Sequence, residues 1–390
     1  MSEIVIDYST LSLSQQVLER QHTHARAIST YLAANADISD ATGLLLSAFD
    51  PLSRSAVSMA EQAMTALSGL ETSLATAVGD TAIDVADNDG QVGTQHTPPY
   101  HDLGGPTLPP AGDSAPSDYG SVDSYFWEKG ISTGESIGGG IDDARALIDD
   151  VGQWGTPSTV TERVDASSFL VPPSAPENFV QDLRWSAGLL LGSIDWVAEK
   201  FLGYSVLQRC VYEPLAGDWQ GIYRASQAWS HGADALMGIS RNHAGLVAST
   251  PATWQGLSGA SFRGAMTSAT GATMGMSAAF EYAAGLVKTI STVCKLACAG
   301  IGSALNVIAN VLIKKAAEAA VPVVGWAVGA ATAYTDINKA VRMVRRIYSL
   351  LEMVSTAIAD FAEGKTSIME KLAVLEDLAQ GMAANAGATA

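Results

Sequence analysis

The feature that most constrains the fold is a tripeptide, Trp254-Gln255-Gly256, between two long apolar stretches with a helical pattern. The first stretch runs from Pro214 to Thr250, and the second runs from Leu257 to the next proline at Pro322. Because proline cannot continue a helix, it marks the outer limit of each stretch. The pattern predicts two long antiparallel helices joined at Trp254. A second copy of the tripeptide, Trp219-Gln220-Gly221, lies within the first stretch.

Residues 1–90 carry the pattern of a helical hairpin. Apolar residues recur every three or four positions, or multiples of that spacing, from Leu13 to Leu32, which predicts an amphipathic helix over residues 10–36. Asp50 is a good N-cap and Pro51 suits the first helical position, so a second helix should start there and end near Gly90. Two helices cannot bury both apolar stripes by themselves, so we expect the hairpin to dock on another partner.

Residues 91–175 have the composition of a linker. Ten of the 14 prolines lie between Pro98 and Pro176, and Gly138-Gly139-Gly140 adds flexibility. We expect short helices at most, over residues 125–129 and 142–150. A linker of this length either wraps around the bundle or stays mobile.

Residues 176–390 are predicted to be helical again, with an apolar stripe from Phe179 to Phe201 and later helices over residues 334–362 and 367–382. Period-two alternation bounded by turn residues is missing. The helix after Trp254 should span roughly 90 Å at about 1.5 Å per residue, with bends at some of its seven glycines from Gly259 to Gly302. We therefore expect an all-α, elongated bundle in which the two hairpins form a four-helix core and C-terminal helices follow.

The charge of the chain narrows the class of partner. With 40 acidic and 22 basic residues, the formal net charge is -18. Such a surface repels phosphates, so we expect no nucleic-acid partner, and anionic lipid is disfavoured over the surface as a whole. Met1-Ser2-Glu3-Ile4 has neither a basic n-region nor an apolar h-region, so we expect no Sec signal peptide.

Catalytic, cofactor and metal sites find little support in the sequence. The six histidines are scattered, and no Ser/His/Asp or Cys/His arrangement is evident. The paired carboxylates Asp142-Asp143 and Asp149-Asp150 lie in the linker, and the glycine run before them follows no predicted strand, so it is no phosphate loop. Cys294 and Cys298 lie four apart on a predicted helix, which suits packing better than metal binding or a disulfide. We expect no cofactor, no metal and no enzymatic activity.

The residues around the tripeptide resemble the WXG superfamily, whose members are substrates of type VII (ESX) secretion. The resemblance covers residues 176–390 and includes Gly192 to Tyr204, Pro214 to Trp219, and Trp229, which are similar to the lead-in of long actinobacterial WXG proteins. In that family the Trp and Gly at the turn form half of a composite export signal. The resemblance therefore assigns this role to Trp254 and Gly256, and we expect the tip position to leave Trp254 outside most core contacts. The alternative is a core plug whose indole N–H is turned to water.

The resemblance also implies a second half of the signal, a Tyr-x-x-x-Asp motif that follows the hairpin helix of the partner. Residues 1–90 resemble the EspC-type or PE-type hairpins that pair with WXG proteins. Here, however, Ile83 stands at the tyrosine position and Asp87 at the aspartate position. An intact match, Tyr119-Gly120-Ser121-Val122-Asp123, lies in the linker. Tyr119 and Asp123 are either the signal or a coincidence of linker sequence.

The whole chain thus resembles a PE and PPE pair fused into one polypeptide, as in EspB-like proteins. The resemblance implies a virulence-associated protein that is secreted or held at the cell envelope, with a structural or protein-interaction role. It implies two kinds of partner: the type VII secretion ATPase, and a small helical-hairpin protein or further copies of this chain.

An alternative from another class is a membrane-active effector. Residues 296–313 and 319–335 are uncharged over 18 and 17 positions, and Lys314, Lys315 and Glu318 separate them. Each run is at the lower limit for spanning a bilayer, so residues 296–335 would insert as a helical hairpin. Asn306 and Asn310 would then need partners within lipid. For this reason we expect burial within a protein bundle instead.

Overall fold

The structure is a computed structural model that describes residues 6–44, 46–92, 108, 137–153, 160–174 and 217–319, and seven single positions between 342 and 359. Within these residues it has five α-helices and no strand, so the predicted all-α fold is confirmed. The expected short helix over residues 125–129 and the apolar stripe from Phe179 to Phe201 lie outside the described residues, as does the last predicted helix. The described positions between 342 and 359 are helical, in agreement with the helix expected there.

The N-terminal hairpin consists of α1 (Tyr8–Asn35) and α2 (Asp50–Val92), joined through the short 3₁₀ helix η1 (Ser47–Phe49). Asp7 caps α1, because its carboxylate accepts a hydrogen bond of 2.9 Å from the backbone N–H of Ser9. Asp50, predicted as the N-cap of the second helix, is instead its first residue. α1 starts two residues before the predicted position 10 and ends one residue before position 36, and α2 ends two residues after Gly90.

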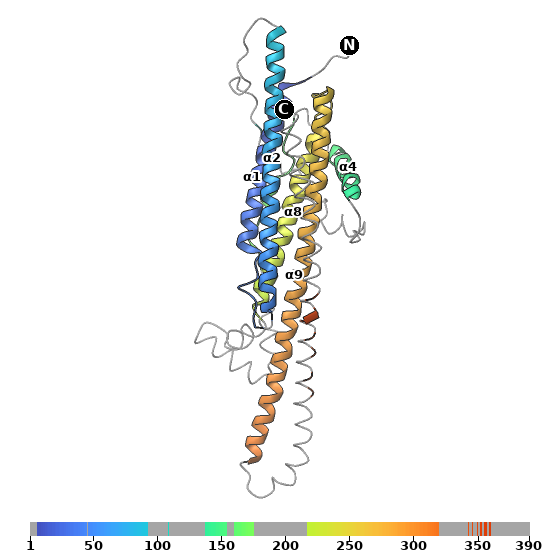
Figure 1. The fold of residues 1–390 in the computed structure, drawn as a ribbon. Helices are drawn as coiled ribbons and strands as arrows, with labels where there is room; N and C mark the ends of the chain where they lie inside the picture. Colours follow the sequence, from blue (N-terminus) through green and yellow to red (C-terminus); the bar gives the residue numbers. More distant parts are fainter. Residues whose placement is uncertain are drawn as a thin grey trace.

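The second hairpin consists of α8 (Trp219–Ser249) and α9 (Gly256–Ala319). The prediction that the first of these helices starts at Pro214 is wrong, because Gly217 has a φ of +94° and Asp218 is the N-cap. α9 has 64 residues, so it is about 96 Å long at about 1.5 Å per residue. It continues as one helix through all seven glycines, and its second half extends past the ends of α1 and α8 (Figure 1).

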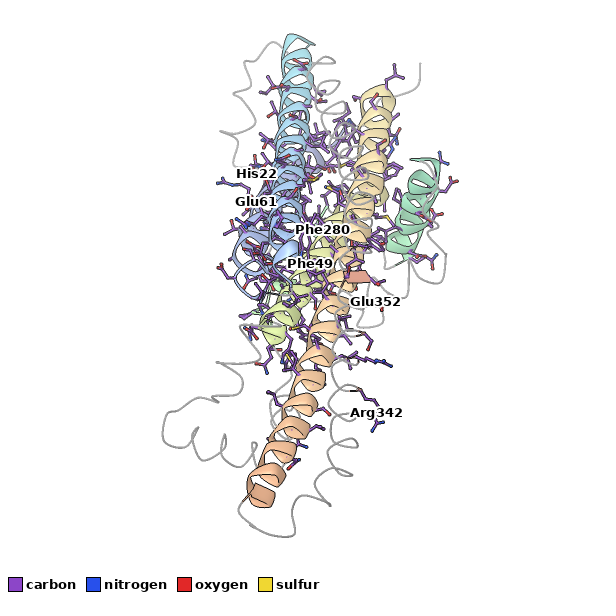
Figure 2. All side chains as sticks on the ribbon, turned by 60° about the horizontal axis from the view of Figure 1, so that its bottom comes forward. His22, Phe49, Glu61, Phe280, Arg342 and Glu352 are labelled. Atoms are coloured by element: carbon purple, nitrogen blue, oxygen red, sulfur yellow. The ribbon has the colours of Figure 1, made fainter. Side chains whose placement is uncertain are left out.

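The core lies between the two hairpins, and a single apolar cluster contains residues from α1, α2, α8 and α9. Phe280 of α9 is fully buried and meets Trp229 of α8 edge to face, with ring centroids 5.2 Å apart. α1 packs along α8, so the N-terminal hairpin docks on the Trp254 hairpin within one chain, as expected. Figure 2 shows side chains filling the space between the helices, with Phe49 and Phe280 among them.

The register between the hairpins is fixed at both ends of α1. Before α1, Ile6 forms an antiparallel bridge with Trp254, and the N–H of Asp7 donates to the carbonyl of Thr253 at 2.8 Å. After α1, Thr42 forms a bridge with Gly217, and the N–H of Asp218 donates to the carbonyl of Ala41 at 2.7 Å. The N-terminal end of α1 is therefore tied to the C-terminal end of α8, and the C-terminal end of α1 is tied to the N-terminal end of α8.

Part of the predicted linker packs onto the bundle. The short helix expected over residues 142–150 is α4 (Ile137–Gln153), and it lies against α8 and α9. It includes Gly138 to Gly140, which the sequence placed in the linker before the expected short helix. Residues 160–174, here named the strap, run along α1 and α8 and contain the 3₁₀ helix η3 (Ala166–Phe169). In the described parts, the linker wraps around the bundle.

Candidate functional site: the Trp254 turn

Trp254 lies in the turn between the two helices of the second hairpin, as the sequence predicted. α8 ends at Ser249, and Thr250 follows as its C-cap. The backbone N–H of Trp254 then donates to the carbonyl of Thr250 at 2.9 Å, which closes the turn. Gly256 has a φ of +88°, a conformation that side chains with a Cβ rarely adopt, and α9 starts at this residue.

The side chain of Trp254 is buried, with only 2% of its surface exposed. Its ring stacks on Phe262 at 4.5 Å between centroids, and its indole N–H donates to the hydroxyl of Ser258 at 3.1 Å. The expectation that Trp254 stays outside most core contacts is therefore wrong. The core-plug alternative describes its burial correctly, although the indole N–H bonds to Ser258 rather than turning to water.

Close packing in the first turns of α9 holds the backbone of Trp254. A Cβ on Gly259 would lie 2.2 Å from the carbonyl oxygen of Trp254, so only glycine fits there. The same oxygen accepts a hydrogen bond of 2.8 Å from the guanidinium of Arg263. Neither Gly259 nor Arg263 was predicted from the sequence as part of the turn. The spacing Trp254-x-Gly256-x-x-Gly259 was the signal that would have pointed to the glycine.

The N-terminal segment completes the turn from outside the hairpin. Ile6 and Asp7 pair with Trp254 and Thr253, and Ile6 packs against the apolar core. These contacts join residues nearly 250 positions apart, so no local pattern would have revealed them. The turn is thus built by two parts of the chain, with α1 starting directly from it.

The outer surface of the turn is exposed. Gln255, Gly256 and Ser258 are exposed, and Leu257 is the most exposed large apolar side chain among the described residues, at 88%. The turn therefore carries a buried anchor, Trp254, directly beside an exposed leucine. Within the described residues no group of three His, Cys, Asp or Glu side chains is placed to hold a metal ion.

The other predicted signal residues are placed only in part. Tyr119 and Asp123 lie outside the described residues. Ile83 lies in α2 with 45% of its surface exposed, and Asp87 lies on the same helix. α1 starts at the Trp254 turn and α2 runs antiparallel to it, so the C-terminal end of α2 and the turn lie at the same end of the bundle (Figure 1).

The second tripeptide is not a hairpin tip. Trp219 is the first residue of α8 and is mostly buried, and the ammonium of Lys295 lies 6.0 Å from its ring centroid. A Cβ on Gly221 would meet the carboxylate of Asp218 at 2.8 Å and the Cβ of Ala41 at 3.0 Å. The glycine therefore lets the N-terminal hairpin approach the start of α8.

The cysteines and the buried charges belong to the core. Cys294 and Cys298 form no disulfide and are fully buried, and the neighbouring Cys298 together with burial raises the pKa of the Cys294 thiol. His243 of α8 and Glu71 of α2 are also fully buried, with Nε2 and Oε1 2.7 Å apart. This pair links the two hairpins inside the bundle.

No protein-family model, curated protein or solved structure matches this chain. Among the described helices, one is long and apolar enough to cross a membrane: the segment Gly256–Val307 of α9, whose most apolar window has a mean hydropathy of 1.4 and is 35% buried. Core helices of soluble proteins pass the same test.

Proposed function

We propose that this protein is a substrate of type VII (ESX) secretion that acts outside the cell or at the cell envelope through protein–protein contacts. The observation that carries the proposal is the position of Trp254 and Gly256 at the turn of a long antiparallel helical hairpin. The WXG resemblance assigns the export signal to a turn of this kind.

The arrangement of the two hairpins supports the proposal. In the WXG resemblance, the signal has two halves on two partner proteins. In this chain the N-terminal hairpin docks on the Trp254 hairpin in cis, and α2 ends at the same end of the bundle as the turn. Asp87 keeps the aspartate place on α2, whereas Ile83 replaces the tyrosine. Tyr119 and Asp123 remain the second candidate for the Tyr-x-x-x-Asp half of the export signal.

The partner we propose for the turn is the type VII secretion ATPase. Leu257 gives the turn an exposed apolar contact, and the positive φ of Gly256 sets the direction in which Leu257 leaves the turn. After export, the same bundle would contact a small helical-hairpin protein or further copies of this chain. We propose no catalytic role and no cofactor.

The test is an export assay of paired tryptophan variants. Trp254→Phe keeps an aromatic side chain in the core but removes the indole, whereas Trp219→Phe makes the same change at a tripeptide that is not a turn. Export is normalised to the folded protein in the cell. We expect Trp254→Phe to reduce export strongly and Trp219→Phe to leave it unchanged. Equal export of both variants would reject the turn as the signal, and Tyr119→Ala in the same assay tests the linker motif.

A second candidate function is insertion into a membrane, and the length and hydropathy of α9 favour it. Residues 296–335, which would insert as a helical hairpin, are described only as far as Ala319. In this part α9 continues as a helix through Lys314, Lys315 and Glu318. Dye release from liposomes by the purified protein distinguishes the two functions. The secretion-substrate proposal predicts no release at neutral pH, and release that is lost on Val323→Asp would favour the membrane-active effector.

A further inference from the structure

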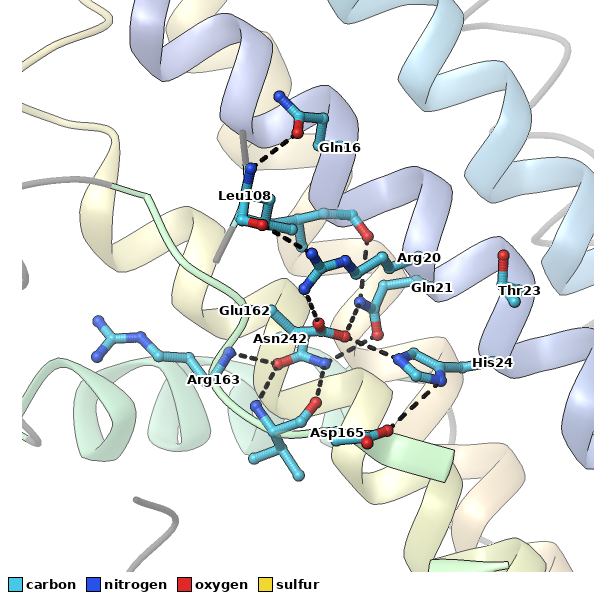
Figure 3. Close-up of polar contacts among 12 residues, drawn as sticks. Gln16, Arg20, Gln21, Thr23, His24, Leu108, Glu162, Arg163, Asp165 and Asn242 are labelled. Carbon is cyan, nitrogen blue, oxygen red and sulfur yellow. Dashed lines mark hydrogen bonds and ion pairs between the residues drawn. The ribbon is translucent and has the colours of Figure 1, made fainter. Parts of the chain in front are cut away.

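The strap is held along α1 and α8 by polar side chains that converge on it (Figure 3). The side chains of α1 and α8 that hold it are here named the strap seat: Arg20, Gln21, His24, Tyr31, Gln227 and Asn242. Apart from η3, the strap has no helix or strand, and its backbone groups therefore need partners from other elements.

The first part of the strap seat recognises a carboxylate. The side chain of Glu162 is 2% exposed and accepts three hydrogen bonds from α1. Arg20 and His24 donate to it at 2.8 Å each, and Gln21 donates at 3.1 Å. Charge-assisted hydrogen bonds of this kind are about twice as strong as neutral ones, so this pocket selects an acidic side chain.

The second part of the strap seat binds the backbone of the two residues that follow the glutamate. The side-chain oxygen of Asn242, which is fully buried, accepts from the N–H groups of Arg163 and Val164 at 2.9 Å each. Its side-chain nitrogen donates to the carbonyl of Val164 at 2.8 Å and to Gln21 at 2.9 Å. The strap and Gln21, which binds the carboxylate, therefore satisfy all the hydrogen-bond donors and acceptors of the Asn242 amide.

The third part fixes the remainder of the strap. Ala166 is buried against Gly238 of α8, where a Cβ would approach it to 3.2 Å. Tyr31 donates to the carbonyl of Val171 at 2.6 Å, and Gln227 accepts from the N–H of Ser174 at 2.8 Å. These seat residues come from two helices whose register is fixed at both ends by contacts outside the strap.

We propose that the strap seat is a binding site for a peptide that carries a glutamate and, four residues later, a small apolar residue, and that its ligand in an assembly is the strap of a second copy of this chain. The strap of a second copy has the same sequence, so it makes the same hydrogen bonds in the same seat. Exchange of an identical segment is a low-cost route to a dimer. This inference does not depend on secretion.

Peptide binding to a chain whose own strap lacks the carboxylate tests the site. The probe is a fluorescent synthetic peptide of residues 160–174, and the host is the full chain with Glu162→Ala. We expect saturable binding by anisotropy and a rise in the Tm of the host. A matched peptide with Glu162→Gln should bind at least about tenfold more weakly, since it lacks the charge. The same host with Asn242→Ala added should bind neither peptide.

Equal binding of the two peptides, or no binding to a folded host, would overturn the proposal. If Glu162→Ala prevents folding, the Glu162→Gln chain replaces it as host, because this side chain keeps the shape and a hydrogen-bond acceptor. The peptide must then still bind that folded host, and failure to do so counts against the site.

Two complementary full-length variants test the second copy as the ligand. A chain with Glu162→Ala has an intact seat, and a chain with Asn242→Ala has an intact strap. We expect a mixture of the two to contain heterodimers by size exclusion with light scattering, whereas each variant alone has the mass of a single chain. Peptide binding without heterodimers would keep the site but reject the second copy.

Discussion

At the scale of single residues, Trp254 combines two properties that looked like alternatives in the sequence. It stands at the turn where an export signal is expected, and it is also among the largest fully buried side chains. The buried indole fixes the turn, while Leu257 beside it is exposed. In our interpretation the tryptophan shapes the surface that a partner contacts and is not itself the contact.

This view predicts that Trp254→Ala destabilises the protein. Removing a buried aromatic side chain costs about 3–5 kcal/mol through lost transfer energy and a cavity. Urea unfolding followed by circular dichroism measures the free energy of unfolding. A loss below about 1 kcal/mol would indicate that Trp254 contributes little to the core, as predicted from its position at the tip.

The glycines of α9 offer a matched pair of substitutions. Gly259→Ala places a Cβ against the carbonyl of Trp254, so we expect a loss of about 1–3 kcal/mol. Gly264→Ala has no atom within 4 Å of the new Cβ, so we expect a gain of about 0.5–1 kcal/mol from helix propensity alone. Thermal unfolding of the two variants measures the contrast, and equal Tm values would contradict the close packing at the turn.

At the scale of elements, the strap links the two hairpins, and the stabilisation that it gives depends on pH. Burial raises the pKa of Glu162, but hydrogen bonds from His24, Arg20 and Gln21 outweigh it and hold the pKa below its ordinary value of 4.5. The Ser167 hydroxyl holds the pKa of Asp165 below its ordinary value of 3.8. Because both carboxyl groups have lowered pKa values in the folded state, their stabilisation is complete above the ordinary values and is lost as the pH falls below them.

We therefore expect the difference in free energy of unfolding between the wild type and Glu162→Gln to be constant from pH 7 to about pH 5. It should then shrink as the pH falls below about 4.5. Urea unfolding at a series of pH values measures this difference, and Glu19→Gln, at an exposed position of α1, is the matched control for general charge effects. A difference that grows on acidification would contradict the sign of these pKa shifts.

The helices were predictable, and the strap was not, for a physical reason. α1, α2 and α9 bury one stripe each, so their apolar spacing is visible in the sequence, and α8 is buried on all sides from Ala235 to Leu246. The strap is ordered by hydrogen bonds between residues far apart in the chain, such as Asn242 with Val164, and an isolated segment carries no trace of them. α4 was found only in part, because packing on α8 and α9 overrides the low helix propensity of Gly138 to Gly140.

At the scale of the whole molecule, the two hairpins form one bundle with an acidic composition and a closed turn at one end. The sequence predicted the cis docking because each hairpin had an apolar stripe without a partner. It did not predict the two antiparallel bridges that fix the docking, since each joins a loop residue to a residue far along the chain. These bridges place the Trp254 turn and the end of α2 at the same end of the bundle.

The central claim is that this bundle is a type VII secretion substrate, and dependence of its export on the secretion ATPase tests that claim most directly. The chain is expressed in a host with an ESX system and in the same host without the ATPase, and the protein is measured in lysate and culture filtrate. We predict folded protein in the filtrate of the first strain and retention in the cells of the second. Equal amounts in both filtrates, or folded protein that stays in the cells of both strains, would contradict the claim.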